Sequence, residues 1–383
     1  MSELSKALQV AEMSALASPQ GEAILNPLSA PSVGAVVVNF NGGDRVLRVI
    51  DALIRQRYPF AEIVVVDNAS SDGSPARIRA TYPTVRLIQH EINEGLPRAR
   101  NVGLAAIQTT LAFVIDHDVY ADERCVEAMV RAYLAERPAV VCPRIRLLPD
   151  RDIVQVEGAS LHFLGTLVLR HGYRSVRDTP AEPCYVDGCT GGCILLERSR
   201  IIDAGGFDES FFFYFEDLEF SLRLRGMGLR IWCEPTAEVF HEPASGTPDL
   251  AFRGRGSYPA RRAYYTMRNR LQVILIHYRW RTLVLLSPVL ALYELAALVA
   301  ALKKGWPEQW LRAWGWQFRH VHTLIARRRV VQGRRTVADR DLLVGGDPPL
   351  APGFVTSRNE MRLLQWFSSA VNGYWSFVRR WVG

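Results

Sequence analysis

The chain has 383 residues and a net charge of +7, a length that allows two or three domains with large cores. The charge is concentrated near the end: residues 303–383 hold 14 Lys and Arg against 5 Asp and Glu, and seven of the nine tryptophans. Because these basic residues alternate with Leu, Val and Trp rather than with Gly and Ser, a membrane surface is favoured and nucleic acid is disfavoured as the partner.

Two further features bound the location and chemistry of the protein. The six cysteines are scattered and show no Cys-x-x-Cys or Cys/His ligand spacing, which predicts reduced cytosolic thiols and no zinc site. The chain lacks a basic start followed by an apolar run, so we expect no secretory signal. Residues 1–31 are rich in Ser, Ala and Pro and are expected to be a flexible lead-in without chemistry.

Apolar strands alternate with helical patterns from residue 33 onward. Strands are predicted over residues 33–39, 62–67, 85–89 and 111–116, and helices after the first strand and over 96–107. Strands that alternate with helices at short intervals indicate an α/β fold with a doubly wound, mostly parallel sheet. Ligands of such sheets bind at the carboxyl ends of the strands.

Acidic side chains stand at two of these strand ends. Asp116 and Asp118 follow the strand over 111–116 with one residue between them, and Asp67 ends the strand over 62–67. Alternate residues of an extended segment point the same way, so Asp116 and Asp118 can share one divalent cation, for which oxygen ligands favour Mg²⁺ or Mn²⁺. An isolated Asp-x-Asp is more often a solvated loop, so the metal-site interpretation depends on the other motifs around it.

Two common nucleotide-binding architectures are excluded by missing motifs. The first strand leads into Asn39, Asn41 and two glycines, without Gly-x-Gly-x-x-Gly, which disfavours a dinucleotide-binding Rossmann domain. No Gly-x-x-x-x-Gly-Lys-Ser/Thr occurs anywhere, which argues against P-loop chemistry.

Further candidate residues follow in the second half. Residues 189–197 place small residues before an apolar strand, where backbone can approach a ligand. An aromatic block then leads into Glu216 and Asp217, which open a short helix. Such a pair is often only a helix cap, but the aromatic wall would desolvate one carboxylate, which suits a general base. A last strand over 229–233 leads to His241.

Together these pieces resemble a family 2 glycosyltransferase of the GT-A fold, closest in pattern to bacterial rhamnosyltransferase-like members. The resemblance extends from about Val33 to Asn269. The matching pieces, in family order, are residues 37–42, 66–73, 93–103, 116–118, 205–209, 216–217 and 241. One departure is His117, which replaces a small or acidic residue between the two aspartates.

The resemblance implies a role for each matching residue. Asp67 would hydrogen-bond the base or ribose of a nucleoside-diphosphate sugar, Asp116 would contact the ribose and the metal, and Asp118 would ligate the metal. His241 would complete the metal shell, Asp217 would be the general base, and Glu216 would orient the site or the acceptor. The remaining donor-binding candidates are Asn39, Asn41, Asn93 and Arg98. Arg98 and Arg100 are candidates for the donor diphosphate, with solvent as the alternative.

The implied enzyme is a hexosyltransferase that inverts the anomeric centre in one displacement. The cation would stabilise the leaving diphosphate, and Asp217 would take the proton of the acceptor hydroxyl. A nucleotidyltransferase is the alternative enzyme, but it would need a basic phosphate loop, and residues 39–44 have no Lys or Arg. A non-catalytic membrane-associated binding module is the third possibility, against which the intact acidic residues speak.

The remainder of the chain points to a membrane. Residues 253–269 carry several arginines among tyrosines, which suit an anionic acceptor or donor phosphate, or simply a solvated helix. Residues 283–302 have one Glu, one Pro and no Lys or Arg, enough to span a bilayer. We favour helices in the cytoplasmic leaflet of the inner membrane over a span or a soluble cap, since basic residues flank both ends. This location fits a lipid-linked or polysaccharide acceptor. The expected domains are 1–31, 32–270 and a helical, membrane-associating region over 271–383.

Overall fold

A computed structural model describes residues 30–242, 258–347 and 357–383. Residues 1–29 of the expected lead-in, and Arg253 and Arg255 of the basic stretch, lie outside the described residues.

The main sheet is α/β and mixed. Four parallel strands stand in the order β3-β2-β1-β4; next to β4, β12 runs antiparallel to it, and β6 runs antiparallel to β12. The bounds are β1 Val33–Asn39, β2 Glu62–Asp67, β3 Arg86–Gln89, β4 Leu111–Asp116, β6 Val140–Leu147 and β12 Cys193–Glu197. The expectation of a mostly parallel sheet is therefore wrong beyond β4, because the chain makes a long excursion after β4 and returns in the opposite sense.

That excursion and the last long strand complete the sheet. Strand β13 (Ile231–His241) runs parallel to β6 and, after an irregularity between Glu234 and Glu238, also pairs with the short β5. The other strands of this part are β5 Val119–Ala121, β7 Ile153–Val156, β10 Arg174–Ser175 and β11 Cys184–Val186. The predicted strand over 229–233 is thus much longer, and it brings His241 next to Val119 of β5, just after the turn that follows β4.

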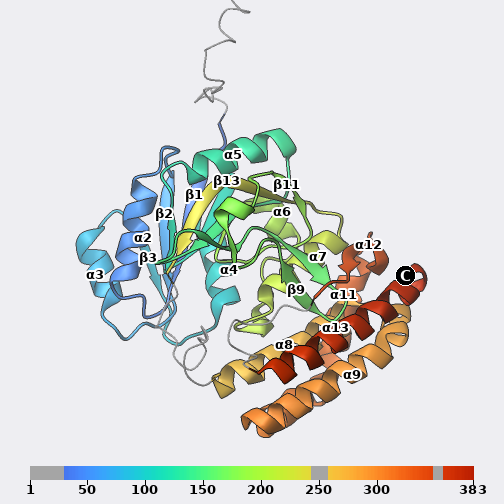
Figure 1. Cartoon of the computed structure of the whole chain (residues 1–383). Helices are drawn as coiled ribbons and strands as arrows, with labels where there is room; N and C mark the ends of the chain where they lie inside the picture. Colours follow the sequence, from blue (N-terminus) through green and yellow to red (C-terminus); the bar gives the residue numbers. More distant parts are fainter. Residues whose placement is uncertain (1–29, 243–257, 348–356) are drawn as a thin grey trace, which may run out of the picture.

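Helices cover both faces of the sheet (Figure 1). The β-branched residues of β1 are buried on alternate sides: Val33, Ala35 and Val37 pack with α2, α3 and α5, while Val36 and Val38 pack with α4, α6 and α7. The helix bounds are α2 Asp44–Ile54, α3 Ser74–Thr81, α4 Leu96–Ala106, α5 Cys125–Glu136, α6 Arg198–Asp203 and α7 Glu216–Gly226. The helix predicted over 96–107 is confirmed as α4.

The C-terminal helices form a third core with α7 and a small sheet, and they gather at one end of the molecule (Figure 1). The helices are α8 Ala260–His277, α9 Trp280–Lys304, α10 Pro307–Arg319, α11 Val321–Gly333, α12 Asp339–Leu342 and α13 Arg358–Val378. The small sheet consists of β8 Ala159–His162, β9 Thr166–Leu169 and β14 Leu343–Val344. Short 3₁₀ turns are η1 Val176–Asp178, η2 Glu209–Phe211 and η3 Arg379–Trp381.

Helix α9 contains the predicted apolar stretch over 283–302. By length and composition it can cross a bilayer, and only 11 % of its most apolar window is buried. Its acidic residue, Glu294, faces inward, where it accepts hydrogen bonds from Arg270 Nη1 at 2.6 Å and Trp314 Nε1 at 3.2 Å. One side of α9 is therefore tied to α8 and α10, and the opposite side exposes Val284, Leu295 and Leu302.

Part of the tail composition has an internal explanation that the sequence analysis did not foresee. Trp306 and Trp375 are buried in cores. In α11, Arg328 donates to the carbonyls of Leu275 and Tyr278, both at 2.6 Å, and just after this helix Arg335 donates to the carbonyl of His277 at 2.5 Å. The last carbonyls of a helix have no partner within it, and these arginines supply donors at the end of α8.

Candidate active site

Three of the predicted polar residues end neighbouring parallel strands. Asn39 of β1 stands in register with Asp67 of β2, and Asp116 of β4 stands in register with Val38 of β1. All three therefore lie at the carboxyl edge of the sheet, where open α/β sheets bind ligands. The prediction that Asp67 and Asp116 line one edge is confirmed.

Asn39 and Asp67 form a buried network. Asn39 Nδ2 donates to Asp67 Oδ1 at 2.7 Å, and Asp67 also accepts from the Ser70 amide at 3.0 Å and the Ser70 hydroxyl at 2.6 Å. Both side chains are fully buried. Asn41, in the turn after β1, also contacts the turn after β2, because its Oδ1 accepts a hydrogen bond from the Ser71 amide at 2.9 Å. These residues shape the turn after β2, so their carboxylate and amide groups are largely engaged by the protein itself.

Asn93 and Arg98 stand around the beginning of α4. Asn93 Oδ1 accepts from Asn68 Nδ2 at 2.8 Å and from the Gly95 amide at 3.0 Å, which ties the turn after β2 to the helix start. Arg98 is exposed and pairs with Glu209 at 3.2 Å, away from the carboxylates of β4 and α7.

The residue that unites the carboxylates is Arg100, which the sequence analysis named only as a diphosphate or solvent-facing candidate. Its side chain is 1 % exposed. Arg100 Nη2 lies 3.3 Å from Asp116 Oδ1, and Nη1 lies 3.4 Å from Asp217 Oδ1 and 3.8 Å from Glu216 Oε1. One buried cation thus faces three carboxylates from β4 and α7.

The surroundings of residue 191, shortly before β12, leave room only for a glycine. A Cβ there would lie 2.6 Å from Asp217 Oδ1 and still closer to Arg100 Nη1. The carbonyl of Gly191 also accepts from Arg100 Nη2 at 2.8 Å. The backbone here approaches Arg100 closely, and a side chain at this position would break the arginine–carboxylate contacts; the predicted close approach to a ligand stays a prediction.

Glu216 and Asp217 differ in their access to the surface. The Glu216 side chain is 6 % exposed and its Oε2 is buried without a partner among the described residues, whereas Asp217 is 23 % exposed. Burial and the neighbouring Asp217 raise the pKa of Glu216 well above its usual range. The carboxylate that the surroundings desolvate is thus Glu216, and Asp217 is the one that an incoming hydroxyl can reach.

The Asp116 side chain is 24 % exposed, about as much as that of Asp217, and it lies beside the buried Arg100. Burial raises its pKa to about 6, against the opposing effect of Arg100. Asp118 follows in the turn after β4 and lies beside the end of β13, where His241 Nε2 is 3.4 Å from Asp118 Oδ2. On the other side of the imidazole, Gln155 Oε1 accepts from Nδ1 at 2.6 Å, which directs Nε2 toward Asp118.

The donor set of this corner suits a hard divalent cation. Asp118 and His241 are brought together, while Asp116 is held toward Arg100; in the ranges described, no three His, Cys, Asp or Glu side chains are close enough to hold an ion alone. Mg²⁺-type ions commonly take one or two protein carboxylates and complete their shell with substrate phosphates and water. Asp118 and His241, at the carboxyl edge of the sheet, therefore form a donor pair that fits such an ion.

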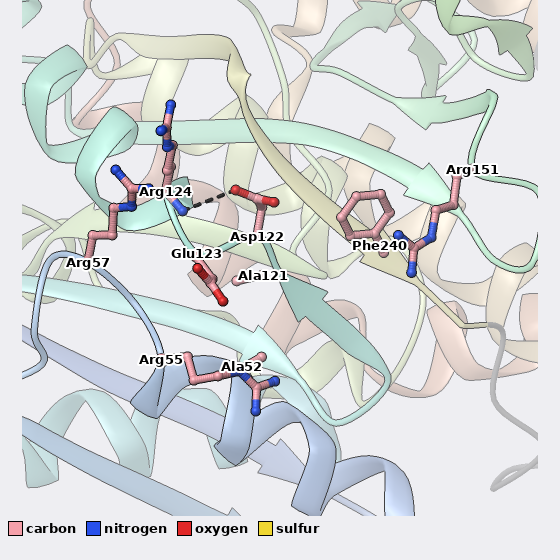
Figure 2. Close-up of a pocket in the computed structure, with 9 residues that line it drawn as sticks. All are labelled: Ala52, Arg55, Arg57, Ala121, Asp122, Glu123, Arg124, Arg151 and Phe240. Atoms are coloured by element: carbon pink, nitrogen blue, oxygen red, sulfur yellow. Dashed lines mark hydrogen bonds between the residues drawn. The ribbon is translucent and has the colours of Figure 1, made fainter.

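A separate pocket of about 460 Å³ lies between α2, β5 and α5 (Figure 2). It is lined by Ala52, Arg55, Arg57, Ala121, Asp122, Glu123, Arg124, Arg151 and Phe240. Phe240 precedes His241 on β13, and successive residues of a strand point to opposite faces of the sheet. This pocket contains none of the predicted site residues and is not the candidate active site.

The last two residues of the basic stretch before α9 are engaged inside the protein, and the cysteines form no disulfide. Arg268 and Asn269 are buried and donate to backbone carbonyls between residues 210 and 214, so the expectation that they meet an anionic acceptor or donor phosphate is wrong. All six cysteines are free. Burial raises the pKa of the Cys189 thiol to about 12, which keeps it protonated.

Comparison with known proteins gives a consistent result. Residues 35–199 match the sequence model described as Glycosyl transferase family 2. The chain is 27 % identical over 239 residues to the N-acetylglucosaminyl-diphospho-decaprenol L-rhamnosyltransferase of Mycobacterium tuberculosis, an alignment covering 55 % of this chain and 76 % of that protein. It is 26 % identical over 218 residues to a low-salt glycan biosynthesis hexosyltransferase of Haloferax volcanii, covering 55 % of this chain and 66 % of that protein.

A solved structure supports the fold. GalNAc-T7, crystallised with UDP, GalNAc and Mn²⁺, superposes with a TM-score of 0.51 at 18 % identity, covering 65 % of this chain and 48 % of that chain. The chain spans about half the length of that protein, and the likeness concerns the fold alone. The main domain is thus a GT-A-like α/β fold with a mixed sheet.

Proposed function

The chain carries a family 2 glycosyltransferase domain, which makes it an enzyme of the glycosyltransferase class with rhamnosyltransferase-like relatives, and on that premise we propose a specific reaction. The protein moves a sugar from a nucleoside-diphosphate donor to an acceptor hydroxyl, with inversion at the anomeric carbon. The observation that carries the proposal is the group of three carboxylates around the buried Arg100. Glu216 is in the first turn of α7 but is buried, and Asp116 is accessible but ends a strand; Asp217 combines a place in the first turn with access to solvent.

Asp217 is the proposed general base. It accepts the proton of the acceptor hydroxyl while that oxygen attacks the sugar, a contribution typically worth about 10²–10⁴-fold in rate. The neighbouring cation Arg100, whose Nη1 lies 3.4 Å from Asp217 Oδ1, keeps this carboxylate oriented. Glu216, buried beside it, holds the first turn of α7 in place and orients the acceptor side. A single base on the face opposite the leaving group is sufficient for inversion.

The donor is proposed to lie along the edge formed by β1, β2 and β4. The turns shaped by Asn39, Asn41, Asp67 and Asn93 form its nucleoside side, and Asp116 borders the ribose. Arg98, exposed beside α4, is the candidate for an outer contact with the diphosphate.

Asp118 and His241, with Asp116 nearby, are the proposed holders of Mn²⁺ or Mg²⁺. When bound, the ion would neutralise charge that develops on the leaving diphosphate. The residues of the chain prepare this position: Gln155 holds the His241 ring so that Nε2 faces Asp118, and Asp118 offers a buried carboxylate at the mouth of the sheet edge.

We also propose that the helices after residue 270 rest on the cytoplasmic face of the inner membrane, where they would meet a lipid-linked or polysaccharide acceptor. Sixteen of the 22 exposed large hydrophobic side chains in the described ranges lie from Trp280 onward. The pairing of Glu294 with Arg270 favours α9 lying at the surface, because a span would separate these two groups. The proposed division is a lead-in over 1–31, a catalytic domain over 32–270 and this region over 271–383.

Product analysis tests the reaction. Purified protein is incubated with a panel of nucleotide sugars, Mn²⁺ and a lipid-diphosphate-linked acceptor in detergent, and the anomeric configuration of the product is read by NMR. Transfer with the configuration opposite to that of the donor is expected. A product that keeps the donor's configuration, or release of free sugar alone, would contradict the proposed displacement.

A further inference from the structure

The loop directly before the proposed catalytic pair has an unusual backbone. Phe212, Tyr214 and Phe215 have positive φ angles of 61°, 65° and 66°. Bulky L-residues rarely adopt this region, and such conformations persist only where the surroundings over-determine them. Phe215 is the N-cap of α7, so the conformation of this loop sets the position of Glu216 and Asp217.

One side chain of α8 holds most of this loop. Asn269 is fully buried, and its Nδ2 donates to the carbonyls of Phe211 at 2.9 Å, Phe213 at 2.9 Å and Tyr214 at 2.6 Å. Its Oδ1 accepts from Arg268 Nε at 2.7 Å and from Gln272 Nε2 at 3.3 Å. Because both donors face the oxygen, the amide can present only its NH₂ group to the loop.

The opposite side of the loop is closed by the start of α4. The Leu96 amide donates to the Phe212 carbonyl at 2.9 Å. A Cβ at Gly95 would lie 2.7 Å from the same carbonyl oxygen, which leaves no room for the loop to shift toward α4. The Phe212 ring also stacks on Tyr265 of α8 at a centroid distance of 5.2 Å. The loop is therefore clamped between α4 and α8.

We propose that Asn269 is a positioning residue for catalysis: by bonding the carbonyls of Phe211, Phe213 and Tyr214 it holds the strained segment 212–215 that places Asp217 beside Arg100. This inference rests on the proposed function, in which Asp217 is the base. It also assigns α8 a part in the chemistry, because this helix carries the anchor.

The test compares two Asn269 variants with a matched control. Asn269→Asp keeps the shape but removes the NH₂ donors, and Asn269→Ala removes the side chain. Gln317→Ala deletes another buried amide that bonds α8 without touching the loop. For each protein the transfer kcat, the nucleotide Kd by equilibrium titration and the Tm are measured.

Because displacing a catalytic group by about 1 Å can cost 10²-fold in rate, Asn269→Asp is expected to lower kcat by about 10²-fold while the nucleotide Kd stays within about twofold. Gln317→Ala is expected to keep its kcat at a similar loss of Tm. If Asn269→Asp does not fold, Asn269→Ala is judged by the same criterion.

Two results would overturn the inference. The first is a kcat loss in both Asn269 variants no larger than that of Gln317→Ala. The second is a parallel loss of nucleotide affinity, which would show a general collapse of the site. Wild-type protein that transfers no sugar would instead contradict the proposed function, so the two failures can be told apart.

Discussion

The sheet edge and the C-terminal helices both combine arginines with aromatic residues, yet they arrange them in opposite ways. At the sheet edge, polar groups converge inward, where Arg100 faces three carboxylates and Asn39 bonds Asp67. In the helices, Arg328 of α11 and Arg335 just after it bond the carbonyls at the end of α8, and apolar side chains face outward. A buried charge is stable only with specific partners inside the fold, as at the sheet edge. A large exposed apolar face is instead typical of a surface that contacts a membrane or another protein.

The largest expected effect concerns the base. Asp217→Asn keeps the size of the side chain but cannot accept a proton, so kcat should fall about 10³-fold while nucleotide binding is retained. Steady-state transfer and nucleotide titration check this. Asp187→Asn, which neutralises a carboxylate paired with Arg225 at the other end of α7, serves as the control and should transfer normally. Normal turnover by Asp217→Asn would remove the base assignment.

The second effect contrasts two arginines on one helix. Arg100→Leu leaves three carboxylates facing one another in a buried space, so we expect the free energy of unfolding to fall by about 3–5 kcal/mol. Arg98→Ala removes an exposed ion pair and should cost less than about 1 kcal/mol. Urea unfolding of both variants measures the difference, and equal losses would show that Arg100 does not hold the site together.

The third effect concerns the ring orientation of His241. Gln155→Leu removes the acceptor of the Nδ1 proton, so the affinity for Mn²⁺ in the presence of nucleoside diphosphate should fall about 10–100-fold. Electron paramagnetic resonance counts free Mn²⁺ directly. Gln56→Leu, a buried glutamine that bonds the Asp122 carbonyl, is the control. Unchanged affinity in Gln155→Leu would place the ion elsewhere.

The fourth effect tests the outward face of the helices. Replacing Val284, Leu295 and Leu302 by Ser should weaken binding to phosphatidylglycerol-containing vesicles by on the order of 10²-fold, since each buried CH₂ contributes about 0.8 kcal/mol. Transfer to a water-soluble acceptor should be unchanged. Ile54→Ser with Ile202→Ser removes exposed apolar groups from the catalytic half and should leave vesicle binding intact. Sedimentation with vesicles distinguishes the two sets.

The smallest effect is a pH dependence of stability. Burial raises the pKa of Glu216 above its unfolded value, so its contribution to stability is full below the unfolded pKa and is lost as the pH rises through the folded one. Glu216→Gln cannot ionise, so its stability should fall less than that of the wild type as the pH rises above about 4.5, the ordinary Glu value. Thermal unfolding across this range gives the comparison, and parallel curves would show that Glu216 is not penalised by burial.

Sequence reasoning succeeded where strand ends and chain order decide the geometry. Asn39, Asp67 and Asp116 end consecutive parallel strands, so their convergence followed from the α/β pattern alone. The antiparallel return of β12 and the role of Arg100 did not follow. The sense of β12 depends on the long excursion after β4, and an arginine on a helix surface looks the same whether it faces solvent or a carboxylate cluster.

The C-terminal region also shows what sequence reasoning can and cannot predict. Its apolar and basic composition predicted helices with an exposed apolar face, and α9 and α13 have one. The composition could not separate arginines that cap carbonyls, such as Arg328 and Arg335, from those that reach the surface. Which carbonyls at a helix end need donors from other segments depends on how the neighbouring helices pack, and composition does not contain that information.

The most direct test of the account is thermal stabilisation of the folded protein by nucleotide sugars, with Mn²⁺ and with a chelator, since a ligand that binds only the native state raises the Tm. The account predicts a clear rise in Tm with one nucleotide class, present with Mn²⁺ and lost both with the chelator and in Asp118→Asn. Equal stabilisation with and without the ion, or by nucleotide sugars in Asp118→Asn as in the wild type, would contradict a metal-assisted donor site at this sheet edge.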